Sequence, residues 1–453
     1  MLNICMKKQS AFHGKLIQKK SLKEYIINKS YSIRKETAMT DNTKELYQKR
    51  IQIVNDTIAM KETDRVPVAP FFASVVQRLF GSCYKDIYYN YDKAGQAAVD
   101  FYTAYPVDAS MGARFTSGKS QELSGINIID WPGKPGTCIS DYSSHQVREI
   151  EYCQPSEYRA MIEDFDGYML RQYIPRVFEN FKNLEKIRFA PATILSSMGG
   201  MKPLLTPEFF EMVDRLKEIY EAEQECAAKS NEWSGKIVGL GIPPMFTGGG
   251  QVPFDVISDY FRQTLPALTD LFEYEDEILE LCDIIADRQI ESWKYLEAAP
   301  LDVKRVFFPL HKAMDGFMSP AQFEKVYIGP YLKQLNYLLS IGATPIIFTE
   351  GPYNTRLEQL AELLPKGCIV GFETVDMKKA KETVGKNNCI WGNLSLYTLE
   401  YGTVEQTINE TKTLIDTCAP GGGYIFGASG CIENAKKENL EAMLDTAETY
   451  GRK

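Results

Sequence analysis

Several polar residues of this sequence directly follow apolar runs, where their side chains could do chemistry. Glu350 follows residues 343–349 (ATPIIFT) and precedes a Gly-Pro pair. A carboxyl group there could be a ligand, or an acid and base toward an acceptor nitrogen or ether oxygen; an ordinary loop carboxylate is the alternative. His311, one of three histidines, follows residues 303–310 (VKRVFFPL). Because imidazole titrates near neutral pH, His311 is a candidate for acid–base or ligand work, with a structural histidine as the alternative.

Further candidates lie in similar positions. Asp108 ends a strand-like unit and either binds substrate or caps the next helix. Glu373 and Asn393 each follow an apolar run, and Asn393 either hydrogen-bonds a ligand or ties two loops together. Arg356 lies in the first turn of a predicted helix, where it could pair with the preceding carboxylate, hold a substrate carboxylate or remain solvated. We therefore predict catalytic roles for Glu350, His311 and Asp108, and substrate binding by Asn393, Glu373 and Arg356.

These residues are positioned by a repeated strand-then-helix unit. Short apolar strands are expected near residues 343, 367, 389 and 423, and further ones near 66, 105, 237 and 303. Apolar strands without polar alternation are buried on both faces, which indicates a parallel sheet covered by helices. About eight units, and no GxGxxG after an early strand, favour a closed (β/α)₈ TIM barrel over an open doubly wound sheet. In such a barrel the residues just past each strand converge on one end, here called the mouth: Asp108, His311, Glu350, Glu373, Asn393 and Cys431.

Local signals refine this scheme. Capping boxes are expected at residues 319–322, 355–358 and 403–406. Residues 237–242 (IVGLGI) suggest a strand that leads into a loop at 243–250, whose three glycines would let backbone approach a ligand or form a flexible turn. Mixed signals between 115 and 205 suggest an insertion in a single barrel domain that covers residues 39–453.

The composition limits the class of protein. The net charge of −9 divides into +7 for residues 1–38 and −16 for the rest, and an acidic body argues against nucleic acid as a partner. We expect the basic segment to lie outside the fold, as a disordered extension or upstream of a true start at Met39; a targeting peptide or a binding arm are alternatives. No run is apolar enough for a membrane span, and ten cysteines without paired spacing favour a cytoplasmic location.

The order of several short motifs carries a family resemblance. These are Arg-x-Pro-Val at 65–68, Pro-Val-Asp-Ala at 106–109, Ser-Pro-x-x-Phe at 319–323, Gly-Asn-Leu at 392–394 and Gly-Cys at 430–431. Together they resemble the uroporphyrinogen decarboxylase superfamily, which also holds methyltransferases that work with methylated corrinoid proteins. The resemblance is clearest from about residue 300 to the end, and it implies a (β/α)₈ barrel.

The chain departs from true uroporphyrinogen decarboxylases. Those enzymes hold the substrate's propionates with an arginine pair after the first strand, where this chain offers only Arg78. Their aspartate is matched by Asp108. An acidic protein without the arginine pair would repel a porphyrinogen with eight carboxylates, which disfavours that substrate.

The chain also departs from the thiol-methylating branch. Those relatives bind zinc through His-x-Cys and a second Cys, and the corresponding positions here hold Phe348, Glu350 and Cys431. A thiol acceptor is therefore in doubt. The resemblance leaves open a zinc site of Glu350, Cys431 and a third group such as Glu373 or His311. An inert buried thiol is the alternative for Cys431.

The resemblance leads to one preferred hypothesis and two alternatives. We expect a methyltransferase component that moves a methyl group between the corrinoid (cobalamin) of a partner protein and a small donor or acceptor such as tetrahydrofolate. The first alternative is a lyase that decarboxylates a smaller acid. The second is a non-catalytic protein that binds a tetrapyrrole or corrinoid.

Overall fold

The computed structural model describes residues 39–452, and the predicted basic extension lies outside them. Its centre is a parallel sheet in the order β3-β4-β5-β6-β7-β8. The strands are β3 Gly248–Gly249, β4 Arg305–Leu310, β5 Thr344–Pro352, β6 Ile369–Thr374, β7 Cys389–Trp391 and β8 Tyr424–Ile425. Each strand pairs with the next along the chain, as expected for strands connected by helices.

Two further segments close this sheet into a ring. The first runs beside β8, where the Ala69 amide donates to the Phe426 carbonyl and Val68 and Phe426 form a parallel bridge. The second runs between the first segment and β3, because the Asp108 amide donates to Val68 and Ser110 bridges Pro244. With the six strands, these segments make the predicted eight-stranded barrel.

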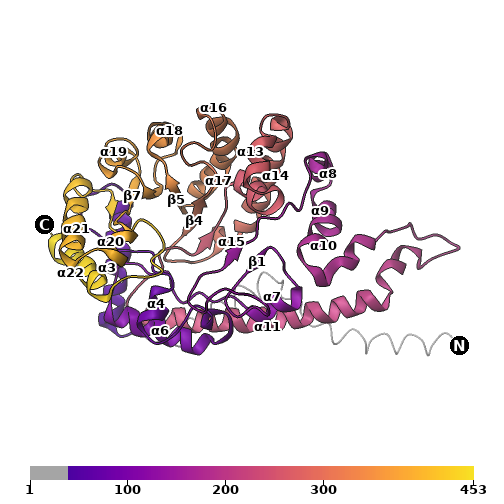
Figure 1. Ribbon diagram of the computed structural model, residues 1–453, viewed down its shortest axis with the longest axis horizontal. Helices are drawn as coiled ribbons and strands as arrows, with labels where there is room; N and C mark the ends of the chain where they lie inside the picture. The colour runs from indigo at the N-terminus through magenta and orange to yellow at the C-terminus, as the bar shows by residue number, and fades with distance from the viewer. Residues whose placement is uncertain (1–38, 453) are drawn as a thin grey trace, which may run out of the picture. The chain divides into compact units, whose positions relative to one another are not determined.

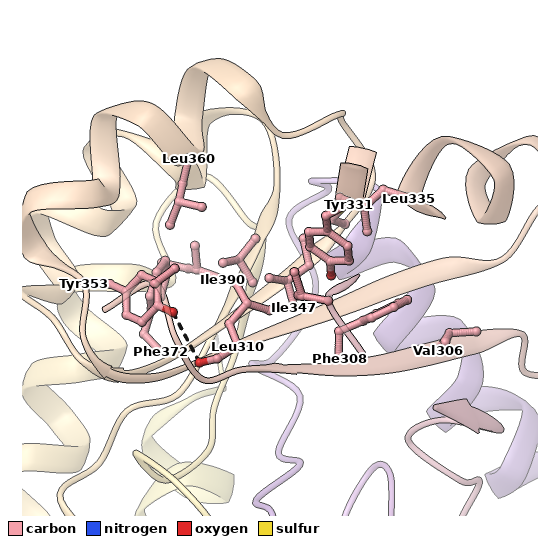
Figure 2. Packing of buried hydrophobic residues seen from close by; sticks show 14 of the residues in the cluster. Val306, Phe308, Leu310, Tyr331, Leu335, Ile347, Tyr353, Leu360, Phe372 and Ile390 are labelled. Atoms are coloured by element: carbon pink, nitrogen blue, oxygen red, sulfur yellow. Dashed lines mark hydrogen bonds between the residues drawn. The ribbon is translucent and has the colours of Figure 1, made fainter. Parts of the chain in front are cut away.

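Alternate residues of the strands point into the barrel or outward. The inward set forms one apolar cluster that includes Ala69, Met111, Phe246, Ile346, Phe348, Ile369, Trp391 and Ile425. Figure 2 shows the outward set of β4–β7, with Phe308, Ile347 and Ile390 packed beneath Tyr331, Leu335 and Leu360 of the covering helices. The Tyr353 hydroxyl donates to the Leu310 carbonyl at 3.2 Å and ties the loop after β5 to the end of β4.

Helices surround the ring (Figure 1). The first half of the chain contributes α3 Asp41–Ile58, α4 Val75–Leu79, α5 Asp86–Tyr89, α6 Tyr91–Ala104, α7 Gly118–Ser124, α8 Tyr158–Glu163, α9 Phe165–Tyr168, α10 Ile174–Val177 and α11 Pro207–Gly239. The second half contributes α12 Pro253–Val256, α13 Thr264–Asp270, α14 Glu275–Trp293, α15 Tyr295–Ala298, α16 Pro320–Gln322, α17 Gly329–Ser340, α18 Leu357–Leu363, α19 Met377–Glu382, α20 Leu396–Tyr401, α21 Val404–Cys418 and α22 Lys437–Tyr450. No helix in residues 39–452 combines the length and the apolar character that a membrane crossing requires.

Helix α3 covers the end of the barrel opposite the mouth, which we call the base. Its Val54 joins the inward cluster, and its Asn55 accepts a hydrogen bond from Arg305 at the start of β4. Arg50 of the same helix donates to the Gly241 carbonyl at 2.9 Å. These contacts close the base with both apolar packing and paired polar groups.

The strand predicted at residues 237–242 was wrong. Its first three residues finish α11, in which Trp233 and Ile237, four residues apart, share the buried face. The barrel segment comes later, in the stretch that was predicted to be a Gly/Pro loop. Gly250 serves packing there, since a Cβ at this position would collide with the rings of Phe308 and Trp293.

The capping predictions had mixed outcomes. The boxes that begin at Ser319 and Thr403 are both present. The one expected at Thr355 is not, because α18 begins after Arg356 without a side-chain cap. The Thr355 hydroxyl instead donates to Asp315 at 2.6 Å.

Between α7 and α11 lie short elements that are outside the barrel. Strands β1 Ile129–Asp130 and β2 Gln146–Val147 form a separate antiparallel pair. Helix α11 then packs along α6 and α7, as Figure 1 shows at its lower edge.

Candidate active site

His311 and Glu350 meet at the mouth because of strand register. Leu310 of β4 pairs with Thr349 of β5, so the next residue of each strand stands side by side. His311 Nε2 lies 3.6 Å from the Glu350 carboxylate. Two residues predicted from sequence as catalytic are therefore adjacent, and each directly follows the last position at which β4 and β5 pair.

An aspartate behind the imidazole fixes its orientation. His311 Nδ1 lies 2.6 Å from the Asp259 carboxylate, which also accepts from Lys312 Nζ at 3.0 Å. Burial alone would lower the pKa of His311, but the hydrogen bond to Asp259 and the charges of two further carboxylates outweigh it and raise that pKa to about 9. At neutral pH His311 is therefore an imidazolium whose outer nitrogen points toward Glu350.

A second aspartate holds the backbone of this pair. Asp255 is buried and accepts hydrogen bonds from the amides of His311 (2.9 Å) and Lys312 (3.1 Å) and from the Tyr327 hydroxyl (2.7 Å). Burial raises the pKa of Asp255 to about 7. Asp255 therefore positions the loop that carries His311 and does not itself face the mouth.

Sequence reasoning missed this support, although a signal was present. Asp255 and Asp259 are four residues apart, which places both carboxylates on one face of the helical segment after β3. That segment begins with α12 and continues as the π-helical turn Ile257–Arg262. The pair could have been selected as a helix face rich in acid, but its partner lies more than fifty residues further along the chain.

Glu350 combines solvent access with a dense protein environment. Its side chain is 47 % exposed, yet burial raises its pKa and His311 opposes that rise. Glu373 raises the pKa further through charge repulsion, and its carboxylate accepts a hydrogen bond from the Gly351 amide. A carboxyl group in this setting can exchange protons with a ligand in the mouth.

Cys431 lies near the same carboxylates, and its side chain is a protonated thiol. Burial and the charges of Glu350, Glu433 and Glu373 raise the pKa of Cys431 to about 12, although the residue is exposed. Within residues 39–452, no three His, Cys, Asp or Glu side chains are grouped as a metal site. The residues thus do not fit a zinc ion in this arrangement. The zinc site therefore stays a prediction of the sequence, and no step below depends on it.

Asn393 and Arg356 have structural partners. The Asn393 amide donates to the carbonyls of Glu373 (3.3 Å) and Val375 (3.4 Å), which corresponds to the loop-tying alternative. Arg356 is buried, donates to the carbonyls of Ala313 and Met318, and lies over the Phe323 ring. It does not pair with the mouth carboxylates, because its guanidinium is committed to the loop after β4.

Asp108 lies at the base, which corrects its predicted place at the mouth. It begins the second barrel segment instead of ending it, since its amide pairs with Val68 near the start of the first. Its carboxylate accepts from Arg65 at 2.6 Å, from the Val68 amide at 2.8 Å, and lies 3.9 Å from Arg50. Charge pairing at the base therefore accounts for Asp108.

The family comparison agrees with this barrel. Residues 240–450 match the sequence model of the family described as uroporphyrinogen decarboxylase (URO-D). The match agrees with the resemblance that the order of the sequence motifs indicates. The matched residues include β3–β8 and hence both Glu350 and His311. No curated protein matches the chain significantly by sequence.

A solved structure extends the comparison of the fold to most of the chain. A methyltransferase from Methanosarcina mazei is similar over 88 % of this chain and 98 % of its own, with a TM-score of 0.56 and 15 % identity. This similarity establishes a shared fold. A B12-independent methionine synthase from Shewanella sp. W3-18-1, in complex with selenomethionine, covers 44 % of this chain and 59 % of its own at 12 % identity, with a TM-score of only 0.31.

Proposed function

We propose that the protein is a methyltransferase that moves a methyl group between a corrinoid protein and a small donor or acceptor. The observation that carries the proposal is the contact of His311 with Glu350 at the barrel mouth, with Asp259 beside the imidazole. The similarity in fold to a methyltransferase over most of both chains supports the same direction. The corrinoid would arrive with its partner protein and would supply the cobalt that exchanges the methyl group, so no residue here is assigned to hold it.

The chain's own contribution is proton handling and orientation. When a methyl group leaves an oxygen or nitrogen, that atom gains electron density and needs a proton or a hydrogen bond. Imidazolium at His311 can supply it through Nε2, either directly or by way of Glu350 at 3.6 Å. Asp259 and Asp255 keep the imidazole charged and fixed in place, which reduces the reorganisation required during the reaction. In the reverse direction the same pair removes a proton from the acceptor.

The decarboxylase alternative is weakened, because the residue expected to act in it is not available to a substrate. Its expected acid was Asp108, whose carboxylate is occupied by Arg65 and is 4 % exposed. A non-catalytic corrinoid-binding protein would have no use for a proton donor in the mouth. The methyltransferase is therefore the function that makes most use of the residues that meet there.

The proposal is tested with methylcobalamin, first alone with candidate acceptors and then with a partner corrinoid protein. We expect cleavage of the cobalt–carbon bond, followed by its visible spectrum, with at least one acceptor. The Glu350→Gln variant should slow it by roughly 100-fold, in the range of general acid–base contributions. Cobalamin binding without turnover, unaffected by Glu350→Gln, would instead support the non-catalytic alternative. Carbon dioxide release from an added acid would support the lyase.

A further inference from the structure

The mouth also contains a positively charged side chain. Among residues 39–452 it belongs neither to the catalytic pair nor to an ion pair of the fold. Arg114 follows the second barrel segment after a turn at Gly112, whose φ is +71°. Its Nε donates to the Met111 carbonyl at 3.0 Å, and its guanidinium lies 4.0 Å from the centre of the Phe246 ring. Met111 and Phe246 both belong to the inward cluster of the barrel, so the guanidinium lies over the barrel interior.

The two terminal nitrogens of Arg114 have no carboxylate partner among residues 39–452. Burial lowers the pKa of Arg114, and the only group that raises it is Tyr102. Arginine nevertheless stays protonated at any physiological pH. By contrast, the arginines at 65, 176 and 262 each form an ion pair with a carboxylate.

The backbone around Arg114 is held from both sides. The Ser234 hydroxyl exchanges hydrogen bonds with the amide and carbonyl of Ala113, at 3.1 Å each. The Ser230 hydroxyl, one turn earlier in α11, accepts from the Phe115 amide at 3.3 Å. The guanidinium is therefore fixed by its neighbours in the chain, by the hydrogen bond of its Nε and by the ring below it. Its two terminal nitrogens form a preformed fork, which suits an anion that accepts two hydrogen bonds.

A group of aromatic rings adjoins this fork. Phe246 stacks on Phe307 at 4.9 Å, and Phe71 meets Phe307 edge to face at 5.5 Å. We call these three residues the aromatic floor. Phe246 is buried, whereas Phe71 and Phe307 are only partly buried and keep some surface exposed. His311 follows Phe307 by four residues along β4 and its end, and this even spacing places both side chains on the inward side. The floor therefore extends from Arg114 toward the catalytic pair.

We infer that Arg114 binds the carboxylate of a flat small molecule whose apolar body lies on the aromatic floor and whose reactive end faces His311 and Glu350. The identification of that molecule as the methyl donor or acceptor rests on the proposed function. The binding itself does not, because it requires only the fork and the floor. An aromatic carboxylate is the simplest molecule with both features, since a planar ring stacks on phenylalanine and its carboxylate matches the guanidinium fork.

Calorimetric titration of the full chain with benzoate tests the inference, with benzamide as a neutral probe of the same shape. Benzoate should bind the native protein more tightly than benzamide does. Arg114→Gln should weaken benzoate roughly 10- to 100-fold, the range for a charge-assisted hydrogen-bonded pair. It should leave benzamide unchanged. Arg114→Lys should recover only part of the loss, because an ammonium lacks the fork.

Arg288→Gln is the matched control. Arg288 also lies near an aromatic ring, that of Phe165 at 5.9 Å, but it pairs with Asp166 on the exposed surface. This variant should bind benzoate like the native protein. Equal thermal unfolding of the Arg114 variants and the native chain separates lost binding from lost folding.

Three results would overturn the inference: no benzoate binding to the native protein, equal binding of benzoate and benzamide, or benzoate binding that survives Arg114→Gln. Inorganic phosphate that displaces benzoate and binds more tightly through Arg114 would also overturn it, since it would assign the fork to a phosphate. Methyl transfer is not measured in this experiment. A failed methyl-transfer assay with intact, Arg114-dependent benzoate binding would therefore refute the proposed function and leave the binding site standing.

Discussion

The two ends of the barrel hold charged residues in opposite circumstances. At the base, the side chain of Asp108 is 4 % exposed and its carboxylate is engaged by Arg65, Arg50 and a backbone amide. At the mouth, the side chain of Glu350 is 47 % exposed, and the charged group within 4 Å of its carboxylate is His311. Both residues are acids next to barrel strands, yet only the one at the mouth has capacity for a ligand.

The comparison shows how one fold divides stability from chemistry. Paired charges at the base fix α3 and the first two barrel segments, and their removal should affect folding. Charges at the mouth shift one another's pKa and remain reachable, and their removal should affect reaction more than folding. The general rule that barrel enzymes react at the carboxyl ends of their strands has the same physical basis.

The largest expected effect is on stability, at the base. Asp108→Asn would leave Arg65 and Arg50 with an uncompensated buried charge, which costs about 3–5 kcal/mol when one partner of a buried pair is removed. The free energy of unfolding in urea measures this loss. Asp166→Asn is the control, since Asp166 pairs with Arg288 at the surface and should cost less than about 1 kcal/mol.

One outcome for Asp108→Asn would contradict the distinction between the base and the mouth of the barrel. If Asp108→Asn abolished activity and left the unfolding free energy at the native value, Asp108 would be a reacting group. The decarboxylase alternative would then regain its acid.

The next effect is on rate, at the mouth. Asp259→Asn removes the carboxylate that holds His311 Nδ1 and should slow methyl transfer by roughly 100-fold, within the range for general acid–base catalysis. His311→Gln should cost at least as much. Asp283→Asn, which removes an exposed aspartate paired with Lys333, should leave the rate unchanged. A native rate in Asp259→Asn would exclude the imidazole as the proton donor.

A smaller expected effect, which can be measured directly, is a change in the pKa of His311. The sequence has three histidines; burial lowers the pKa of His145, and His13 lies outside the described residues. Nuclear magnetic resonance of labelled imidazoles should show a histidine signal with a pKa of about 9 that is absent in His311→Gln. In Asp259→Asn this pKa should fall toward its ordinary value near 6.5, by roughly one to two units, because the main group that favours the charged form is gone. A native His311 pKa in that variant would contradict the assigned role of Asp259.

The fold was largely predictable because its signals are local. The strands β4–β8 are apolar runs, and the helices after β4, β6 and β7 begin with side-chain caps, such as the capping box at Ser319. The strand β3 was not predictable, because residues 237–242 before it are compatible with both a strand and the last turn of a helix. Only the buried face that Ile237 shares with Trp233 across α11 decides between them.

The site was predictable where it depends on strand ends and not where it depends on distant pairing. His311 and Glu350 follow directly from apolar strands, so their meeting needed only the barrel. Asp108 was misplaced because its partner Arg65 is forty-three positions away and pairs with it only after the ring has closed. Arg114 was missed for a related reason. What fixes its guanidinium is the Phe246 ring beneath it and the serines of α11 beside it, and these residues are distant in the sequence.

The smallest expected effect separates Cys431 from the acids around it. Burial and three nearby carboxylates keep it a neutral thiol, so it lacks the thiolate that nucleophilic attack requires. Cys431→Ser should then change the rate by no more than about twofold, as expected of a substitution outside the mechanism. Metal analysis of the native protein and this variant supplies the contrary outcome. The contrary result would be one zinc per chain in the native protein that is lost, together with activity, in Cys431→Ser. It would mean that the mouth rearranges around a metal and that residues there are its ligands.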